Sequence, residues 1–192
     1  DVSHTATAGS QFVWIPVGDV IKDSAGNKEK ITLSRYTFAN DNVGTPIDKG
    51  SAKIENDFNS SYSHTEINTA PNGNKTAKEN IESEESGFRK SAKDNHGYYI
   101  GRYEARTNTE RKSKTDKLTQ ITVKPDEYVY NYTTQLQAAT LSRGMYSDSN
   151  FESDLMNSYA WDTAVYFLQT FDNRANKASL KPYSRQTSLN SS

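Results

Sequence analysis

The sequence predicts an α+β fold with a small core and long solvated loops around it. Two strand-like segments come first, a helical segment and two more strands follow a polar stretch, and two helical segments come last. Hydrophobic residues make up 33% of the chain and the mean hydropathy is −0.91. Globular domains are usually about 45–50% apolar with glycine included, so we expect a small core. The 12 Tyr, 7 Phe and 2 Trp residues are typical of extracellular β structure or a binding surface, because a tyrosine ring packs while its hydroxyl reaches water.

The first two strands are predicted to form a β-hairpin or to lie as adjacent strands. Residues 11–20 are β-branched and aromatic, and Pro16 places this strand at a sheet edge or at its own end. Residues 30–38 alternate between apolar and polar side chains, and the segment SAGN at residues 24–27 is a turn signal between the two.

Polar segments surround and interrupt the predicted framework. Residues 1–10 form a polar lead-in, and residues 39–75 form a long excursion rich in Asn, Ser, Thr, Gly and Asp, with one short strand at residues 53–55. Loops of this length are uncommon in compact domains and are often functional. Residues 172–192 form a polar tail without a closing strand.

Three segments have helical patterns. Residues 76–96 begin with Thr76 as an N-cap and Glu79 as its capping-box partner, and Gly97 closes the helix. Residues 134–145 carry Leu136, Ala139, Leu141 and Met145 on one side. Residues 157–171 place Trp161, Ala164, Val165, Leu168 and Phe171 at helical spacing after Asn157 as the cap.

Two further strands are predicted between the helices. Residues 97–106, GYYIGRYEAR, alternate along their length, and residues 118–123 form a short strand. The charged residues 107–117 connect them as a turn.

Four blocks in register resemble the formylglycine-generating-enzyme family, also called the sulfatase-modifying-factor family. They are FVWIPV at residues 12–17, YIGRYEARTN at 99–108, YNYTTQLQA at 130–138 and LMNSYAWD at 155–162. In detail they are most similar to bacterial surface or pilin-associated domains related to the variable proteins of diversity-generating retroelements.

The resemblance implies a C-type-lectin-like fold over residues 11–171, as a single domain that lacks its C-terminal portion. The family's catalytic cysteines, copper site and most calcium ligands belong to the later half, which we expect to begin after Ser192, and no position of this chain matches them. Only framework residues carry over: Trp14, Pro16, Tyr99, Tyr103, Glu104, Asn157 and Trp161. The implied role is display and binding of a ligand, and the chain's start at Asp1 leads us to expect a processed N-terminus.

Structural roles are the expectation for the framework residues. Trp161 is expected to anchor the core and Trp14 to pack. Glu104 shares a strand face with Arg102 and Arg106, because side chains at i and i+2 point the same way, so an ion-pair ladder is expected there.

Composition excludes several other classes of function. The net charge is −1 and cysteine is absent, so disulfides, thiolate metal sites and a cysteine nucleophile do not occur in this chain. The longest apolar stretches fall far short of the ~20 residues that span a bilayer, so we expect no membrane insertion by this chain. Residues 102–117 hold six basic and three acidic side chains with no aromatic residue after Tyr103, which indicates a charged hairpin tip and no nucleic-acid partner.

No cofactor or metal site is predicted. His4, His64 and His96 are scattered and do not suggest a metal triad. Asparagine and aspartate cluster at residues 40–42 and 56–57. Oxygen-rich loops can bind calcium, but a solvated loop is the interpretation we favour, with calcium as the alternative.

Three functions follow as hypotheses. The first is a non-catalytic, extracellular binding or adhesion module that recognises a protein or glycan through its loops. The second is a structural, pilin-like filament subunit that contacts neighbouring subunits, since an unpaired strand edge is a template for strand addition. The third is an enzyme of the formylglycine-generating type with its catalytic residues outside this chain.

Overall fold

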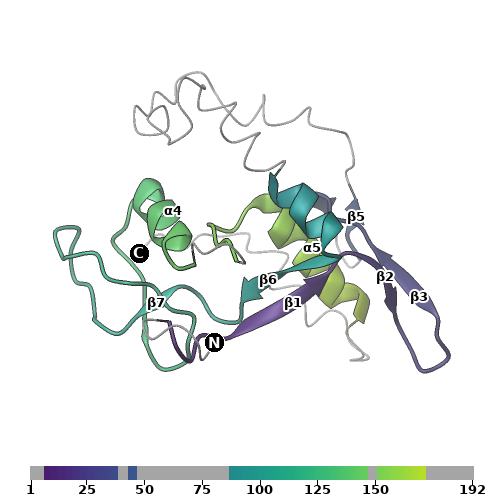
Figure 1. The fold of residues 1–192 in the computed structure, drawn as a ribbon, viewed down its shortest axis with the longest axis horizontal. Coiled ribbons are helices and arrows are strands. Elements are labelled where there is room, and N and C mark those ends of the chain that lie inside the picture. Colours follow the sequence, from purple (N-terminus) through teal and green to yellow (C-terminus); the bar gives the residue numbers. More distant parts are fainter. Residues whose placement is uncertain (1–6, 39–42, 47–86, 147–150, 172–192) are drawn as a thin grey trace, which may run out of the picture. The chain divides into compact units, whose positions relative to one another are not determined.

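The computed structural model describes residues 7–38, 43–46, 87–146 and 151–171 (Figure 1). They belong to two compact units. Unit 1 comprises Asp1–Trp14 and Tyr99–Met156, and unit 2 comprises Ile15–Tyr98 and Asn157–Ser192. Short antiparallel strand pairs and helices confirm the α+β class. The single domain over residues 11–171 stays a prediction.

The strand predicted over residues 11–20 is two strands, β1 (Phe12–Pro16) and β2 (Gly18–Ile21). Proline has no N–H to donate to a ladder, and Gly18 has a φ of 112°, which only glycine adopts readily. The chain therefore turns between Pro16 and Gly18. β1 forms a two-stranded sheet with β6 (Gly97–Gly101), and Pro16 ends β1 as expected.

The predicted hairpin is confirmed in unit 2, where β2 pairs antiparallel with β3 (Lys28–Ile31) from Gly18↔Ile31 to Ile21↔Lys28. Asp23 organises the turn: its carboxylate accepts the backbone N–H groups of Ala25 and Asn27 and the Asn27 side-chain amide. These hydrogen bonds, the side-chain bond from Asn27 first, lower the pKa of Asp23.

The continuous strand predicted over residues 30–38 is wrong. β3 ends at Ile31, and after an irregular stretch β4 (Tyr36–Thr37) pairs with β5 (Thr45–Pro46), which lies inside the expected excursion. The cause is a side chain from the last helix. The Ser34 N–H donates to Thr163 Oγ1 at 3.2 Å, and the Thr163 hydroxyl donates to the Ser34 carbonyl at 3.2 Å. A buried hydroxyl thus replaces a strand partner for this backbone.

The predicted last helix is confirmed as α5 (Ser158–Phe171), with the Asn157 side chain accepting the Ala160 N–H at 2.9 Å. Its buried face includes Ala164 and Val165, as expected, together with several polar residues. Trp161 is 51% exposed, so the prediction that it anchors the core is wrong. The i, i+3, i+4 spacing of apolar residues predicted the helix correctly but not its buried face. Polar side chains that hydrogen-bond neighbouring segments share this face with Ala164 and Val165.

A helical segment covers residues 87–94, and Phe88 packs edge-on against Tyr98 with ring centroids 5.2 Å apart. His96, with a φ of 58°, reverses the chain after it, and Gly97 is already the first residue of β6. The helical segment is therefore closed by His96, and not by Gly97 as the sequence predicted. Thr76 and Glu79 lie outside the described residues.

Unit 1 is built on a small apolar cluster of Ile121, Val123 and Met145, against which Phe12, Tyr130, Leu141 and Tyr146 pack. The predicted helix over residues 134–145 is confirmed as α4 (Gln135–Arg143), which begins with a capping box. In that box Thr134 Oγ1 accepts the Gln137 N–H and Gln137 Oε1 accepts the Thr134 N–H.

The strand predicted over residues 97–106 ends at Gly101. A Cβ at Gly101 would lie 2.9 Å from Val123 Cγ1, so glycine permits a close approach there. The chain bends, and β7 (Arg106–Thr107) then pairs with β8 (Tyr128–Val129).

The strand predicted over residues 118–123 is reduced to a single bridge between Arg106 and Thr122. The Tyr130 hydroxyl accepts the Thr119 N–H at 3.0 Å and donates to the Thr119 carbonyl at 3.1 Å. As at Ser34, side-chain hydrogen bonds satisfy backbone groups that a ladder would otherwise pair.

The strand expected at residues 53–55, the clusters at residues 40–42 and 56–57, and the tail at residues 172–192 lie outside the described residues. Across the residues that the structure does describe, no helix has the length and apolar character to cross a membrane.

Candidate functional site

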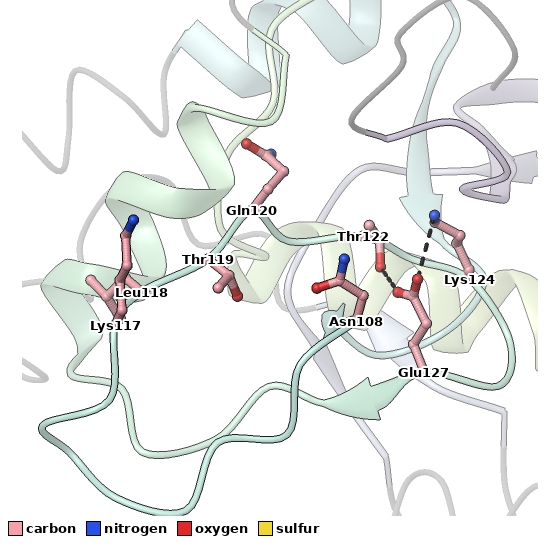
Figure 2. A pocket seen from close by; sticks show the side chains of 8 residues that line it. All are labelled: Asn108, Lys117, Leu118, Thr119, Gln120, Thr122, Lys124 and Glu127. Carbon is pink, nitrogen blue, oxygen red and sulfur yellow. Dashed lines mark hydrogen bonds and ion pairs between the residues drawn. The ribbon is translucent and has the colours of Figure 1, made fainter.

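The connection between β7 and β8 in unit 1 carries a polar pocket of about 430 Å³ (Figure 2). This volume lies within the usual range of ~300–1,000 Å³ for ligand pockets. Eight side chains line it: Asn108, Lys117, Leu118, Thr119, Gln120, Thr122, Lys124 and Glu127. We call this set the loop pocket.

One end of the loop pocket is fixed by hydrogen bonds around Glu127. Its carboxylate accepts the Thr122 hydroxyl and pairs with Lys124 Nζ at 3.4 Å, as the dashed lines in Figure 2 show. Its backbone carbonyl accepts Arg106 Nη1 at 2.8 Å, and Arg106 exchanges two backbone hydrogen bonds with Thr122. The Glu127 side chain is only 16% exposed, so this end is rigid and its charge is compensated.

The other end of the loop pocket is open and bears an exposed ammonium group. Lys117 and Leu118 lie away from the Glu127 end in Figure 2. Among the described residues, Lys117 Nζ has no hydrogen-bond or ion-pair partner. Next to it, Asp116 holds the turn by accepting the Lys112 N–H at 2.6 Å and the Ser113 N–H at 3.0 Å. These bonds lower the pKa of Asp116.

Between the two ends lie the side-chain amides of Asn108 and Gln120. Asn108 Oδ1 accepts the Thr109 hydroxyl at 3.0 Å, and Gln120 makes only a long contact of 3.5 Å to the Ile121 carbonyl. Each amide has two N–H donors and one carbonyl acceptor. The loop pocket therefore offers both donors and acceptors over its whole length, which suits a ligand with many hydroxyl groups.

A second hollow in unit 1, of about 470 Å³, is lined by Ser10, Gln11, Phe12, Val13 and Arg102. Its one charged group is already engaged, because Arg102 Nη1 donates to Gln11 Oε1 at 2.9 Å. The loop pocket thus has the richer set of binding groups.

The sequence-predicted aromatic residues of unit 1 come together in pairs outside the loop pocket. Trp14 packs on Tyr99 with ring centroids 4.8 Å apart and an interplanar angle of 64°, and the two are 39% and 62% exposed. Tyr103 contacts two guanidinium groups, with its ring centroid 5.8 Å from Arg102 Cζ and 5.6 Å from Arg106 Cζ.

The ion-pair ladder expected at Glu104 is not formed. Within the described residues neither arginine pairs with it, because Arg102 bonds Gln11 and Arg106 bonds the Glu127 carbonyl. The alternation that would align these side chains requires an extended strand, and the strand ends at Gly101.

Sequence reasoning did not single out the loop pocket. Lys117 was part of the predicted charged hairpin tip, but Asn108, Gln120 and Glu127 carried no pattern of their own. Asn108 fell in the predicted turn over residues 107–117, Gln120 in the predicted strand over residues 118–123, and Glu127 in neither. The pocket depends on a return of the chain that only the β7–β8 pairing creates.

No metal centre is formed by the part of the chain that the structure describes, where no three His, Asp or Glu side chains gather. His4 and His64, like the clusters at residues 40–42 and 56–57, lie outside it.

No family model, curated protein or solved structure matches the chain.

Proposed function

We propose that the chain is a non-catalytic, extracellular binding module of a bacterial surface or pilus-associated protein, and that the loop pocket is where it recognises a glycan. The C-type-lectin-like fold of the formylglycine-generating-enzyme family is part of this proposal. Its support is the resemblance of four sequence blocks, together with an α+β class built from short strand pairs and long loops.

One observation carries the proposal: the loop pocket combines amide, hydroxyl, ammonium and carboxylate groups in about 430 Å³ of space. A saccharide presents hydroxyl groups that donate and accept, and a side-chain amide can do both in return. A protein ligand would favour a larger surface with aromatic anchors at its centre. The lining of the loop pocket holds no aromatic side chain.

The fixed Glu127 end supports recognition as well. Its carboxylate, already held by Thr122 and Lys124, keeps lone pairs for an additional donor and needs no reordering when a ligand arrives. Preorganised groups of this kind increase affinity because less conformational entropy is lost on binding.

The test is binding of the whole chain to an immobilised glycan panel, with a double variant Asn108→Ala/Gln120→Ala. The expected result is binding by the wild-type chain and a loss of at least ~10-fold in the double variant, since two hydrogen-bonding amides are removed. Gln135→Ala is the matched control, because this amide is exposed on α4 of the same unit and does not line the pocket.

Two outcomes oppose the proposal. Binding that survives in the double variant but disappears in Trp14→Ala would move the recognition surface to the Trp14–Tyr99 pair. A panel that captures no glycan, alongside capture of a defined protein ligand by the same chain, would replace the glycan with a protein.

A further inference from the structure

The charges around the loop pocket are unequally compensated. Lys124 and Glu127 neutralise each other at one end, whereas Lys117 at the other end has no partner among the described residues. The lining therefore holds two cations and one anion, with the excess positive charge at the open end.

The two carboxylates of the loop over residues 107–117 already have partners. Glu110 pairs with Lys112 at 3.3 Å, and Asp116 accepts two backbone N–H groups and the Ser113 hydroxyl. Neither carboxylate is thus available to Lys117 without breaking these contacts.

A buried guanidinium in the same loop adds to the positive potential. Arg111 is 3% exposed, donates Nη2 to the Tyr132 carbonyl at 2.9 Å and lies 5.1 Å from the centre of the Tyr130 ring. Among the described residues, its buried Nε and Nη1 atoms have no hydrogen-bond partner. Solvent and salt screen such a charge less than an exposed one, so it favours an anion at the nearby surface.

From this arrangement we infer that the loop pocket takes an acidic saccharide, with a carboxylate or sulfate group of the sugar bound by Lys117. The amides of Asn108 and Gln120 bind the hydroxyl groups of the ring, and Lys117 supplies a charge-assisted hydrogen bond that a neutral sugar lacks. This inference rests on the proposed glycan-binding function and adds the charge of the ligand and the residue that selects it.

The experiment is isothermal titration calorimetry of the whole chain with three oligosaccharides of equal length. One ends in glucose, one in glucuronic acid and one in a sulfated glucose, so the last two separate a carboxylate from a sulfate. We expect the acidic ligands to bind about 2–5-fold more tightly than the neutral one at low salt, the range of one charge-assisted contact at an exposed site. The preference should shrink at 0.5 M salt.

Three variants test whether Lys117 causes the preference for acidic ligands. Lys117→Ala should remove the preference for the acidic ligands, while Lys117→Arg should keep it because the charge remains. Lys114→Ala is the matched control: it removes the same charge from the same loop, but the exposed Lys114 does not line the pocket, so it should change the affinity less than twofold.

The outcomes separate this inference from the proposed function. Equal affinity for the neutral and acidic sugars, lost in the Asn108→Ala/Gln120→Ala variant, would overturn the inference and leave glycan binding intact. Equal losses in Lys117→Ala and Lys114→Ala would also overturn it, since the net charge of the loop would then suffice. No binding of any of the three would count against both.

Discussion

Replacing Asp162 with alanine removes the carboxylate that joins the β3–β4 segment to α5 in unit 2. Its side chain is 12% exposed. Oδ2 accepts Arg35 Nε at 2.8 Å and the backbone N–H of Tyr36 at 3.0 Å.

The expected loss of stability of unit 2 has two parts. A buried backbone N–H left without an acceptor costs about 1–3 kcal/mol. The ion pair adds about 0.2–1 kcal/mol, because Arg35 is 42% exposed and its charge remains hydrated after the substitution. Asp162→Ala should thus lower the free energy of unfolding of unit 2 by about 1–4 kcal/mol, and Asp162→Asn should fall below this because the amide oxygen still accepts the Tyr36 N–H.

Asp154 provides the matched control. It pairs with Arg143 Nε at 3.1 Å, with the two side chains 46% and 39% exposed, and it bonds the exposed N–H of Leu155. Water replaces these partners, so Asp154→Ala should cost no more than ~1 kcal/mol.

The assay is urea unfolding followed by tryptophan fluorescence, because the two tryptophans fall in different units: Trp14 in unit 1 and Trp161 in unit 2. In a Trp14→Phe background the signal reports unit 2, and in a Trp161→Phe background it reports unit 1. Equal shifts for Asp162→Ala and Asp154→Ala would refute the reasoning, since burial of the Tyr36 N–H is what separates the two.

Three further predictions concern unit 1. Gly101→Ala should destabilise it by about 1–3 kcal/mol in the Trp161→Phe assay, because the new Cβ would lie 2.9 Å from Val123 Cγ1; an unchanged midpoint would contradict the close approach. Thr134→Ala should cost ~1 kcal/mol by removing the acceptor of the Gln137 N–H, whereas Thr134→Ser should be nearly neutral. The lowered pKa of Asp116 means that its contribution is present above the ordinary pKa of 3.8 and is lost as pH falls through the folded-state value; an NMR midpoint at or above 3.8 for this carboxyl would contradict it.

Local signals allowed the helices and the hairpin to be predicted. Asn157 and Thr134 each precede an amphipathic run, and both cap the helices that follow. The β2–β3 hairpin was visible because a short turn signal separates two β-rich segments, although its organiser is Asp23, one residue before the predicted turn.

The long strands predicted over residues 30–38 and 118–123 are wrong for a physical reason that composition does not reveal. Alternation predicts which side chains share a face but not which partner satisfies the backbone. At Ser34 the partner is Thr163, 129 residues away in the chain, and at Thr119 it is the Tyr130 hydroxyl. Such side-chain partners end a strand where its pattern would continue.

The loop pocket could not be predicted from the sequence for a similar reason. Asn108 and Glu127 are far apart in a polar loop, and neither has a motif that predicts binding. Only the pairing of β7 with β8, and the bonds that hold Glu127 to Thr122 and Arg106, create a common pocket from them.

The most direct test of acidic-glycan binding at the loop pocket is an NMR titration of the ¹⁵N-labelled chain with the oligosaccharide that ends in glucuronic acid. Side-chain amide signals report single residues, so the predicted result is a saturable shift of the Asn108 and Gln120 NH₂ groups, with those of Asn95 and Asn157 unchanged. Shifts confined to signals outside the loop pocket, or no saturable shift at all, would contradict the claim that this pocket binds an acidic glycan.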